Sequence, residues 1–262
     1  MKRKLNVTFL AATALVAVGC GDANGPMTVD SEWSGNISRG DHIEIKGVNG
    51  DIFASATSGD YVIVTVAKEG NDSDPNEVEI EVVTHDEGVT ICAMYPDVPG
   101  EQPNVCAPGT GGRVNTQDND VTVTFSVAVP AGVGFVAYTV NGSVTAMDLE
   151  SDARAYTVNG SVDISTSQHA TAGTVNGSID ARIGVTDLDY DLSFATVNGD
   201  IFVQVPANMN ADVQLQTVNG SVTADMQFTI VSPGDIRGAL GLGGRSLLMS
   251  AVNGSLELDT RG

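Results

Sequence analysis

Basic residues are scarce in this chain of 262 residues: Lys and Arg number 12 against 33 Asp and Glu, which gives a formal net charge of -21. Contacts to phosphate need Lys and Arg, so nucleic acid and anionic lipid headgroups are poor partners. Aromatic residues make up only 5% of the chain, whereas glycine is abundant at 30 residues. This composition is typical of a chain that turns corners often around a narrow aliphatic interior.

Histidine is also rare, and none of His42, His85 and His169 stands in a motif with Ser, Cys or Asp. A nucleophile needs a base within hydrogen-bond reach and usually a third group to orient it. Polysaccharide lyases and hydrolases built on parallel β-helices use clustered acids with Lys or Arg, but only Arg154 and Arg182 are basic between residues 134 and 236. We therefore expect a protein that is not an enzyme and needs no cofactor, with a glycan-active enzyme as an alternative.

The one long apolar run, Leu5 to Val18, follows three basic residues and ends just before Gly19 and Cys20. Its length and the small residues before the cysteine indicate a bacterial lipoprotein signal peptide over residues 1–19. Cleavage would leave Cys20 as the lipidated N-terminus of a chain anchored to a membrane by acyl chains, followed by a flexible tether over 20–40. An ordinary signal peptide with an accidental cysteine is the alternative. The sequence thus predicts a lipid-anchored protein of the bacterial cell envelope, at the periplasmic face of the outer membrane or at the cell surface.

The other two cysteines, Cys92 and Cys106, are separated by 13 residues rich in Pro and Gly. In an oxidising compartment we expect them to form a disulfide, which contributes about 3 kcal/mol by restricting the unfolded chain. A metal site or a reactive thiol is the alternative, and His85 is the closest imidazole. One His with two Cys is a weak set of zinc ligands.

The tetrapeptide Val-Asn-Gly-(Ser/Asp) occurs seven times. Its asparagines are Asn49, Asn141, Asn159, Asn176, Asn198, Asn219 and Asn253, and the five from 141 to 219 follow one another at intervals of 18, 17, 22 and 21 residues. Such a period is typical of a repeat protein whose units stack on one another. Apolar and polar residues alternate after each copy, so each unit carries a half-buried strand.

Asn-Gly is also the strongest local signal for a two-residue hairpin, so a hairpin meander is an alternative. The recurrence of Thr, Val, Ser and an aliphatic residue in register favours stacked parallel coils instead. In this interpretation each Asn bonds the corners above and below it, and the Asn-Gly pair supplies a positive φ at the corner. The valines before the asparagines would then form a continuous internal column, made of Val140, Val158, Val175, Val197 and Val218.

We therefore predict an all-β fold with a parallel β-solenoid of short coils over residues 131–262. An N-terminal β region with longer strands and the cysteine loop precedes it over 41–130, where apolar runs alternate with turn signals. The break between Asn219 and Asn253 is expected to be a loop or an irregular terminal coil, because the ends of solenoids need capping.

Three alternating carboxylates, Asp187, Asp189 and Asp191, would lie on one side of a strand and could chelate calcium. An acidic strand face turned to water is the favoured interpretation, because the alternation itself demands polar residues there. We predict no other metal site.

Two segments, residues 155–164 (AYTVNGSVDI) and 249–258 (MSAVNGSLEL), resemble the repeats of the bacterial "putative adhesin" family, a domain of unknown function found in envelope proteins. The resemblance extends to residues 43–52 and covers roughly residues 40 to 262. It implies an elongated β-solenoid that acts in adhesion, by binding a surface protein or glycan, and it implies no catalytic residues. A structural or stress-related envelope scaffold is the alternative role.

Overall fold

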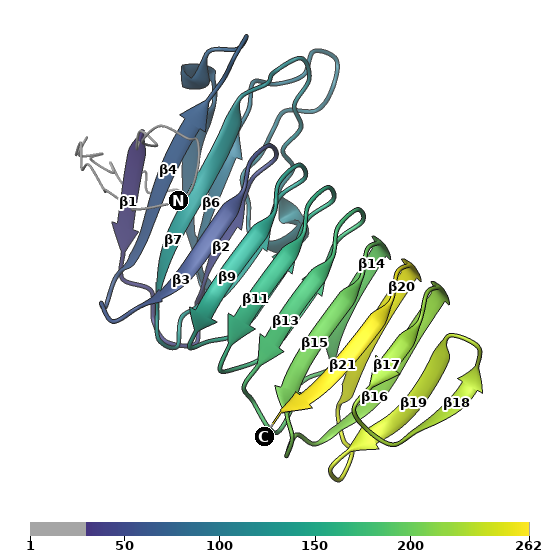
Figure 1. Ribbon diagram of the computed structural model, residues 1–262. Helices are drawn as coiled ribbons and strands as arrows, with labels where there is room; N and C mark the ends of the chain where they lie inside the picture. Colours follow the sequence, from purple (N-terminus) through teal and green to yellow (C-terminus); the bar gives the residue numbers. More distant parts are fainter. Residues whose placement is uncertain (1–29, 262) are drawn as a thin grey trace, which may run out of the picture.

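The computed structural model describes residues 30–261, so the predicted signal peptide, Cys20 and residues 20–29 of the predicted tether lie outside the described residues. The prediction of a flexible tether is wrong for its second half, because residues 31–35 form a strand that pairs antiparallel with residues 62–66. Twenty-one strands form two sheets that pack face to face in an elongated stack (Figure 1). We name them the front sheet and the back sheet, as they lie in Figure 1. In the part of the chain that is described, no helix is long and apolar enough to cross a membrane.

The front sheet has ten strands in the order β1-β4-β7-β3-β9-β11-β13-β15-β21-β17. They are β1 (Ser31–Gly35), β4 (Val62–Glu69), β7 (Thr122–Pro130), β3 (Ile52–Thr57), β9 (Val144–Leu149), β11 (Val162–Thr166), β13 (Ile179–Ile183), β15 (Ile201–Pro206), β21 (Leu256–Arg261) and β17 (Val222–Ala224).

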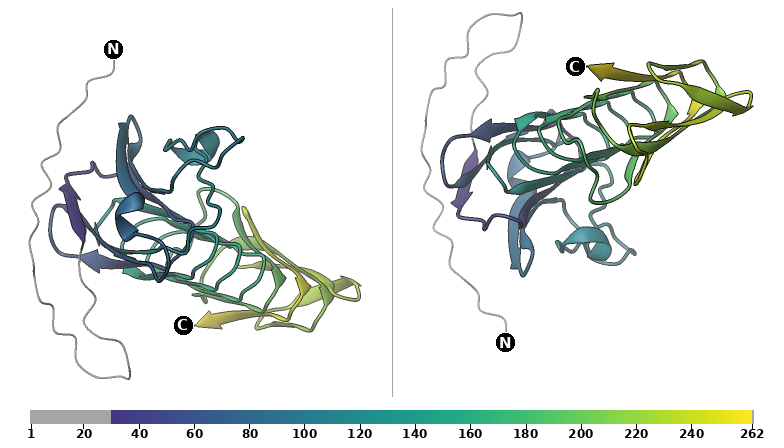
Figure 2. Two further views of the ribbon diagram at one scale, coloured as in Figure 1. Left: turned by 90° about the horizontal axis from the view of Figure 1, so that it is seen from above. Right: turned by 90° about the horizontal axis from the view of Figure 1, so that it is seen from below.

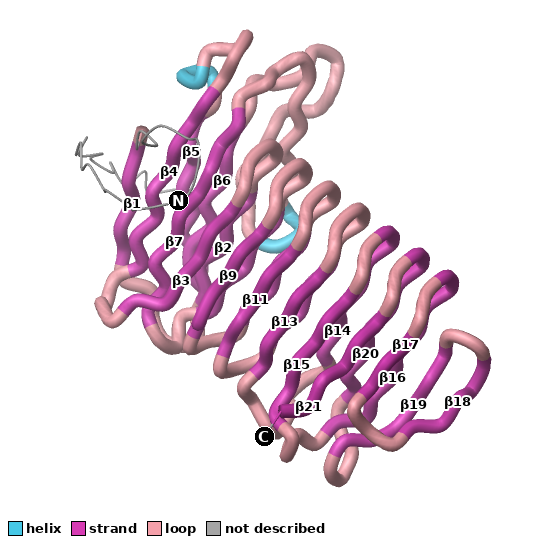
Figure 3. The backbone as a smooth tube through the Cα atoms, viewed as in Figure 1, coloured by secondary structure: helices cyan, strands magenta, loops and turns pink. Residues whose placement is uncertain are grey.

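The back sheet has eleven strands in the order β18-β19-β16-β20-β14-β12-β10-β8-β2-β6-β5. They are β18 (Phe228–Ser232), β19 (Asp235–Leu240), β16 (Ala211–Asn219), β20 (Ser246–Asn253), β14 (Leu192–Asn198), β12 (Ala170–Gly173), β10 (Ala153–Tyr156), β8 (Gly134–Tyr138), β2 (His42–Lys46), β6 (Gly88–Met94) and β5 (Glu79–His85). Two short 3-10 turns, η1 (Pro75–Glu77) and η2 (Gly109–Gly111), lie in the connections (Figure 3).

Each Val-Asn-Gly corner joins the two sheets. A strand of the back sheet such as β8 leads through the corner into a strand of the front sheet such as β9, and neighbouring levels pair in parallel. The hairpin interpretation of these corners is therefore wrong. Antiparallel pairs occur near the two ends of the stack, as in β1–β4 and β5–β6 at one end and β18–β19 at the other. The all-β prediction is confirmed, and the two large sheets are mostly parallel but mixed.

Among the Val-Asn-Gly levels, the order in space differs from the order in the sequence at one place. The last repeat is inserted between the two before it, because β20 pairs with both β14 and β16, and β21 pairs with both β15 and β17. Figure 1 shows this as yellow strands between green ones. The segment between Asn219 and Asn253, expected to be a loop or an irregular coil, instead contains the antiparallel pair β18 and β19.

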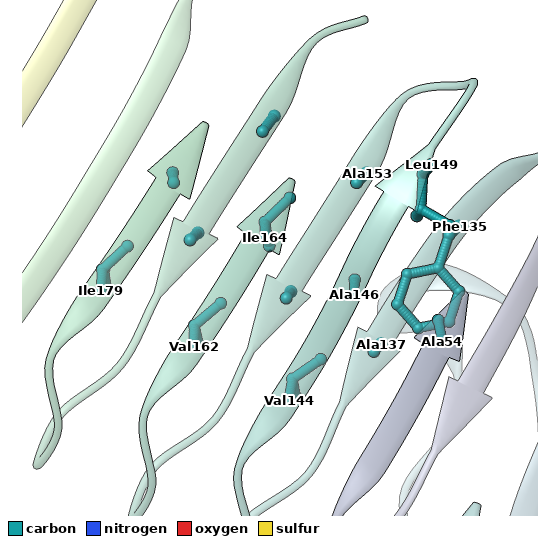
Figure 4. Packing of buried hydrophobic residues seen from close by; sticks show 14 of the residues in the cluster. Ala54, Phe135, Ala137, Val144, Ala146, Leu149, Ala153, Val162, Ile164 and Ile179 are labelled. Carbon is teal, nitrogen blue, oxygen red and sulfur yellow. The ribbon is translucent and has the colours of Figure 1, made fainter. Parts of the chain in front are cut away.

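The core lies between the sheets and is built from small and branched aliphatic residues. Val144, Val162 and Ile179 occupy one register position on neighbouring strands and are at most 1% exposed. Alanines such as Ala153 and Ala146 also point into this interior, and Phe135 is one of its few large side chains (Figure 4). The scarcity of aromatic residues therefore fits a narrow interior, whose buried apolar surface stabilises the stack.

The predicted internal column of valines is wrong. Val140, Val158, Val175 and Val197 are 36–39% exposed and Val218 is 74% exposed. The threonines that precede them are buried instead, at 5–7% exposure: Thr139, Thr157, Thr174, Thr196 and Thr217. Each threonine hydroxyl donates to a glycine carbonyl of a neighbouring corner, as from Thr174 to Gly160 at 2.9 Å. A carbonyl that is removed from water and has no donor destabilises the fold, and a valine side chain at the inward position could not donate a hydrogen bond.

Close packing of one corner on the next explains the glycine of the repeat. A Cβ atom on Gly177 would lie 1.9 Å from the carbonyl oxygen of Gly160, and one on Gly160 would lie 2.0 Å from that of Gly142. Among the corner glycines, only Gly50 and Gly199 have a positive φ, of 122° and 151°. The expected positive φ thus applies to two corners, whereas the lack of a side chain is needed for the close approach of successive levels.

Candidate functional site

The repeat asparagines form one continuous ladder along an edge of the stack. Along the order Asn49, Asn141, Asn159, Asn176, Asn198, Asn253, Asn219, each side-chain amide N–H donates to the amide oxygen of the preceding asparagine at 2.8–2.9 Å. Because these amides bind one another, the ladder ties the levels together and fixes their register.

The predicted disulfide between Cys92 and Cys106 is confirmed, with the two Cα atoms 5.8 Å apart. Cys92 pairs in register with Lys46 on the outer face of the back sheet, so the bridge fixes the loop after β6 to that face. The teal-blue loop with its short helical turn stands out from the stack in Figure 2.

Two charged residues of β2 hold the same loop. Lys46 Nζ donates to the carbonyl of Ala107 at 2.6 Å and to that of Gly109. The Glu44 carboxylate is 1% exposed and accepts from the backbone N–H of Gly109 at 3.1 Å and from the hydroxyl of Thr90 at 2.7 Å. These contacts give the buried carboxylate the hydrogen bonds that it needs.

The three aspartates weighed as a calcium site lie in the loop between β13 and β14, so their expected placement on a strand is wrong. They have separate partners: Asp187 accepts from the Asn210 side chain at 2.8 Å, and Asp191 accepts from the backbone N–H of Ser246 at 2.9 Å. Over residues 30–261, no group of three or more His, Cys, Asp or Glu side chains is placed to hold a metal ion.

A cluster of tyrosines lies on the outer face of the back sheet. We name it the tyrosine patch and define it as Tyr138 on β8, Tyr156 and Arg154 on β10, and Tyr190 in the loop after β13. Tyr138 and Tyr156 are register partners and stack with ring centroids 5.2 Å apart and planes at 13°. Three of the five tyrosines of the chain thus gather on one face.

The side chains become small on the strand next to the stacked rings. The register partner of Tyr156 on β12 is Gly173, and that of Gly173 on β14 is Ala195. A Cβ atom on Gly173 would lie 3.0 Å from Tyr156 Cδ1, so the ring leans over the glycine. The half-buried ring of Tyr156 therefore borders a stretch of sheet without large side chains.

Arg154 is exposed, and its Cζ lies 5.5 Å from the ring centroid of Tyr190. Among the described residues it forms no ion pair. Arg182, the other basic residue between 134 and 236, instead lies 3.0 Å from Asp180 and 3.7 Å from Asp163. The Arg154 guanidinium thus presents its N–H donors beside an aromatic ring.

A partly buried network positions Tyr190. Its hydroxyl donates to Asp152 Oδ2 at 2.8 Å, and Asp152 Oδ1 lies 3.0 Å from Nδ1 of His169. Nε2 of His169 accepts from the backbone N–H of Asp189 at 3.2 Å, which places the histidine proton on Nδ1. Burial, together with the Asp152 carboxylate, raises the pKa of Tyr190 to about 12, so its hydroxyl stays protonated at neutral pH.

This network resembles a catalytic dyad but lacks the free nitrogen that one requires. His169 is 4% exposed, and both of its ring nitrogens are occupied. A general base must have a lone pair within reach of the proton that it removes. The geometry therefore suits His169 to positioning Asp152 and Tyr190.

Part of the tyrosine patch has a sequence signal. Tyr138 and Tyr156 both stand directly before Thr-Val-Asn-Gly, so two successive repeats carry a tyrosine in the same register. Stacked parallel levels would bring such residues together. Tyr190 and His169 lie outside this register and carry no comparable signal.

No protein-family model matches the chain, and no curated protein matches it. Among solved structures, a "putative cell adhesion protein" from Clostridium sporogenes has a TM-score of 0.44 at 11% identity, covering 88% of this chain and 99% of its own. A "putative adhesin" from Bacteroides fragilis has a TM-score of 0.36 at 11% identity, covering 88% and 96% of the two chains. Another from Parabacteroides merdae has a TM-score of 0.25 at 9% identity, covering 87% and 95%. Likenesses of this size do not establish a family or a function for this chain, and the resemblance to the adhesin repeats stays a prediction.

Proposed function

We propose that the protein is a non-enzymatic, lipid-anchored protein of the bacterial cell envelope that binds a surface partner, as an adhesin does. In this proposal the two-sheeted stack is a β-solenoid that serves as a rigid support, and the tyrosine patch is the binding surface. The observation that carries it is the gathering of three of the five tyrosines and an arginine without an ion-pair partner on one outer face. The three tyrosines are half-buried and Arg154 is exposed. Tyrosine and arginine side chains are enriched where proteins bind partners.

The other histidines support a non-enzymatic role. His42 and His85 lie with ring centroids 5.5 Å apart, and burial lowers the pKa of His42. His85 Nε2 lies 3.1 Å from the hydroxyl of Thr90, which in turn donates to Glu44. Because Thr90 is 0% exposed, this hydroxyl cannot meet a substrate as a nucleophile. A glycan-active enzyme is therefore the weaker alternative.

A structural or stress-related envelope scaffold is the second candidate. The asparagine ladder supports it, because seven linked amides and a disulfide-fixed loop make a rigid body. A scaffold needs no open aromatic surface, whereas an adhesin does.

The test is sedimentation of the purified protein with intact bacterial envelopes. We expect the unaltered protein to co-sediment and Tyr156→Ala to lose most of this binding. Phe53→Ala is the matched control, because Phe53 is an aromatic residue of the front sheet that is 41% exposed. If the unaltered protein fails to co-sediment, or if both variants bind alike, the tyrosine patch is not the binding surface and the scaffold role is favoured.

A further inference from the structure

We infer that the ligand of the tyrosine patch is an uncharged glycan chain. This inference rests on the proposed function and adds the chemical class of the partner. Three properties of the patch support it: its ring surfaces, its hydrogen-bonding groups and its place within the sheet.

The first property is the aromatic surface beside Gly173. A sugar ring offers one face of C–H groups that carry a small positive charge, and an aromatic ring is negative over its face. Tyr156 leans over Gly173, and the next residues in the same row are the small side chains Ala195 and Ser250. A flat ring can therefore settle on the sheet next to Tyr156 without meeting a large side chain.

The second property is the set of groups that can bind hydroxyls. Arg154 stands two residues before Tyr156 on the same strand, a separation of about 6.6 Å, which is comparable to the width of a sugar ring. Asp152 has both carboxylate oxygens occupied by His169 and Tyr190, so it leaves the guanidinium of Arg154 free to donate. The Asp189 side chain is exposed in the same loop as Tyr190 and offers acceptors.

Charge decides between neutral and acidic glycans. The chain carries a formal net charge of -21, so its surface repels polyanions. Of the two cations at the patch, Lys46 lies 5.7 Å from the Tyr138 ring centroid but is 3.6 Å from Glu44 and is bound to the carbonyl of Ala107. This leaves Arg154 without an ion-pair partner in the described part of the chain. Uncharged hydroxyls have no such barrier and can bind donors and acceptors together. The geometry therefore favours a neutral chain over a uronate or sulfated one.

The position of the tyrosine patch within the back sheet argues against a peptide as the ligand. Extended peptides bind sheets by adding a strand to an exposed edge, where backbone groups are unpaired. Strands β8 and β10 lie in the interior of the back sheet, with paired strands on both sides. A ligand can therefore contact only side chains at this surface. This suits a glycan, whose sugar rings and hydroxyl groups bind to side chains.

The test is an array of neutral and acidic glycans probed with the purified full chain, followed by calorimetric titration of the best-bound neutral oligosaccharide and of tetragalacturonate. We expect neutral glycans to dominate the array and tetragalacturonate to bind at least about tenfold more weakly at low salt. Tyr156→Ala should weaken neutral binding by about tenfold or more, which corresponds to about 1.4 kcal/mol. Arg154→Gln should also weaken it, and Arg182→Gln, the matched arginine of the front sheet, should leave it unchanged.

Several outcomes would overturn the inference. These are an array without neutral glycans among its bound members, tetragalacturonate binding as tightly as the neutral chain, or equal binding by the protein and Tyr156→Ala when circular dichroism shows both folded. If glycans fail but the protein still sediments with envelopes and Tyr156→Ala does not, the glycan inference falls and the proposed function stands. If Tyr156→Ala sediments like the unaltered protein, the proposed function fails at this site.

Discussion

Two separate substitutions at neighbouring residues of one corner test which side chain stabilises the stack. Thr174 is 7% exposed and donates to the carbonyl of Gly160 at 2.9 Å, whereas the next residue, Val175, is 38% exposed. Thr174→Val keeps the shape of the side chain but removes the donor from a partly buried carbonyl, which costs about 1–3 kcal/mol. The added methyl group returns up to about 0.8 kcal/mol, so we expect a net loss of between about 0.2 and about 2.2 kcal/mol.

The matched variant is Val175→Thr, which changes an exposed position and should alter the free energy of unfolding by less than about 0.5 kcal/mol. Urea unfolding followed by circular dichroism measures both, and the midpoint should shift for Thr174→Val without a change of slope. An internal valine column would give the opposite ranking. A larger loss for Val175→Thr than for Thr174→Val would therefore refute the inward placement of the threonines.

Gly177→Ala should destabilise the protein by at least about 3 kcal/mol, because the new Cβ would lie 1.9 Å from the carbonyl of Gly160; a melting temperature near that of the unaltered protein would contradict the close stacking. Reduction of the bridge between Cys92 and Cys106 should cost up to about 3 kcal/mol in the N-terminal β region, while the repeats keep their circular-dichroism signal. Two reactive thiols in the native exported protein would show that this bridge does not form. Cys20→Ser should abolish labelling by fatty acids and release the protein from membranes, and an unlabelled parent protein would end the idea of a lipid anchor.

The repeats predict the strands well but leave the corners ambiguous. Counting alternate residues forward from the inward Ala137 places Thr139 inside, whereas counting back from the inward Val144 places Val140 inside. The corner shifts the alternation by one position, and hydropathy alone favours the valine. Hydrogen bonding decides the matter, because the glycine carbonyls of the corners accept from the buried threonine hydroxyls.

The insertion of the last repeat could not be predicted from the sequence. All seven copies carry nearly the same corner, so the copy of Asn253 fits between any two levels as well as at an end. The tyrosine patch could be predicted from the sequence only in part. The shared register of Tyr138 and Tyr156 predicts their stacking, but the position of Tyr190 depends on a loop and on its hydrogen bond to Asp152. Tertiary contacts of this kind have no local sequence signal.

The inserted repeat has a consequence for how the chain is made. Synthesis proceeds from the N-terminus, so β16 and β17 emerge before β20 and β21, yet in the finished protein they rest on those later strands. Until the final residues are available, the level of Asn219 lacks its native neighbour, and the vacant place beside Asn198 can accept it in an equivalent register. We therefore expect β16 and β17 of the growing chain to remain unpaired, or to pair provisionally with β14 and β15. They would reach their native places once β20 and β21 have been made and insert between the two levels.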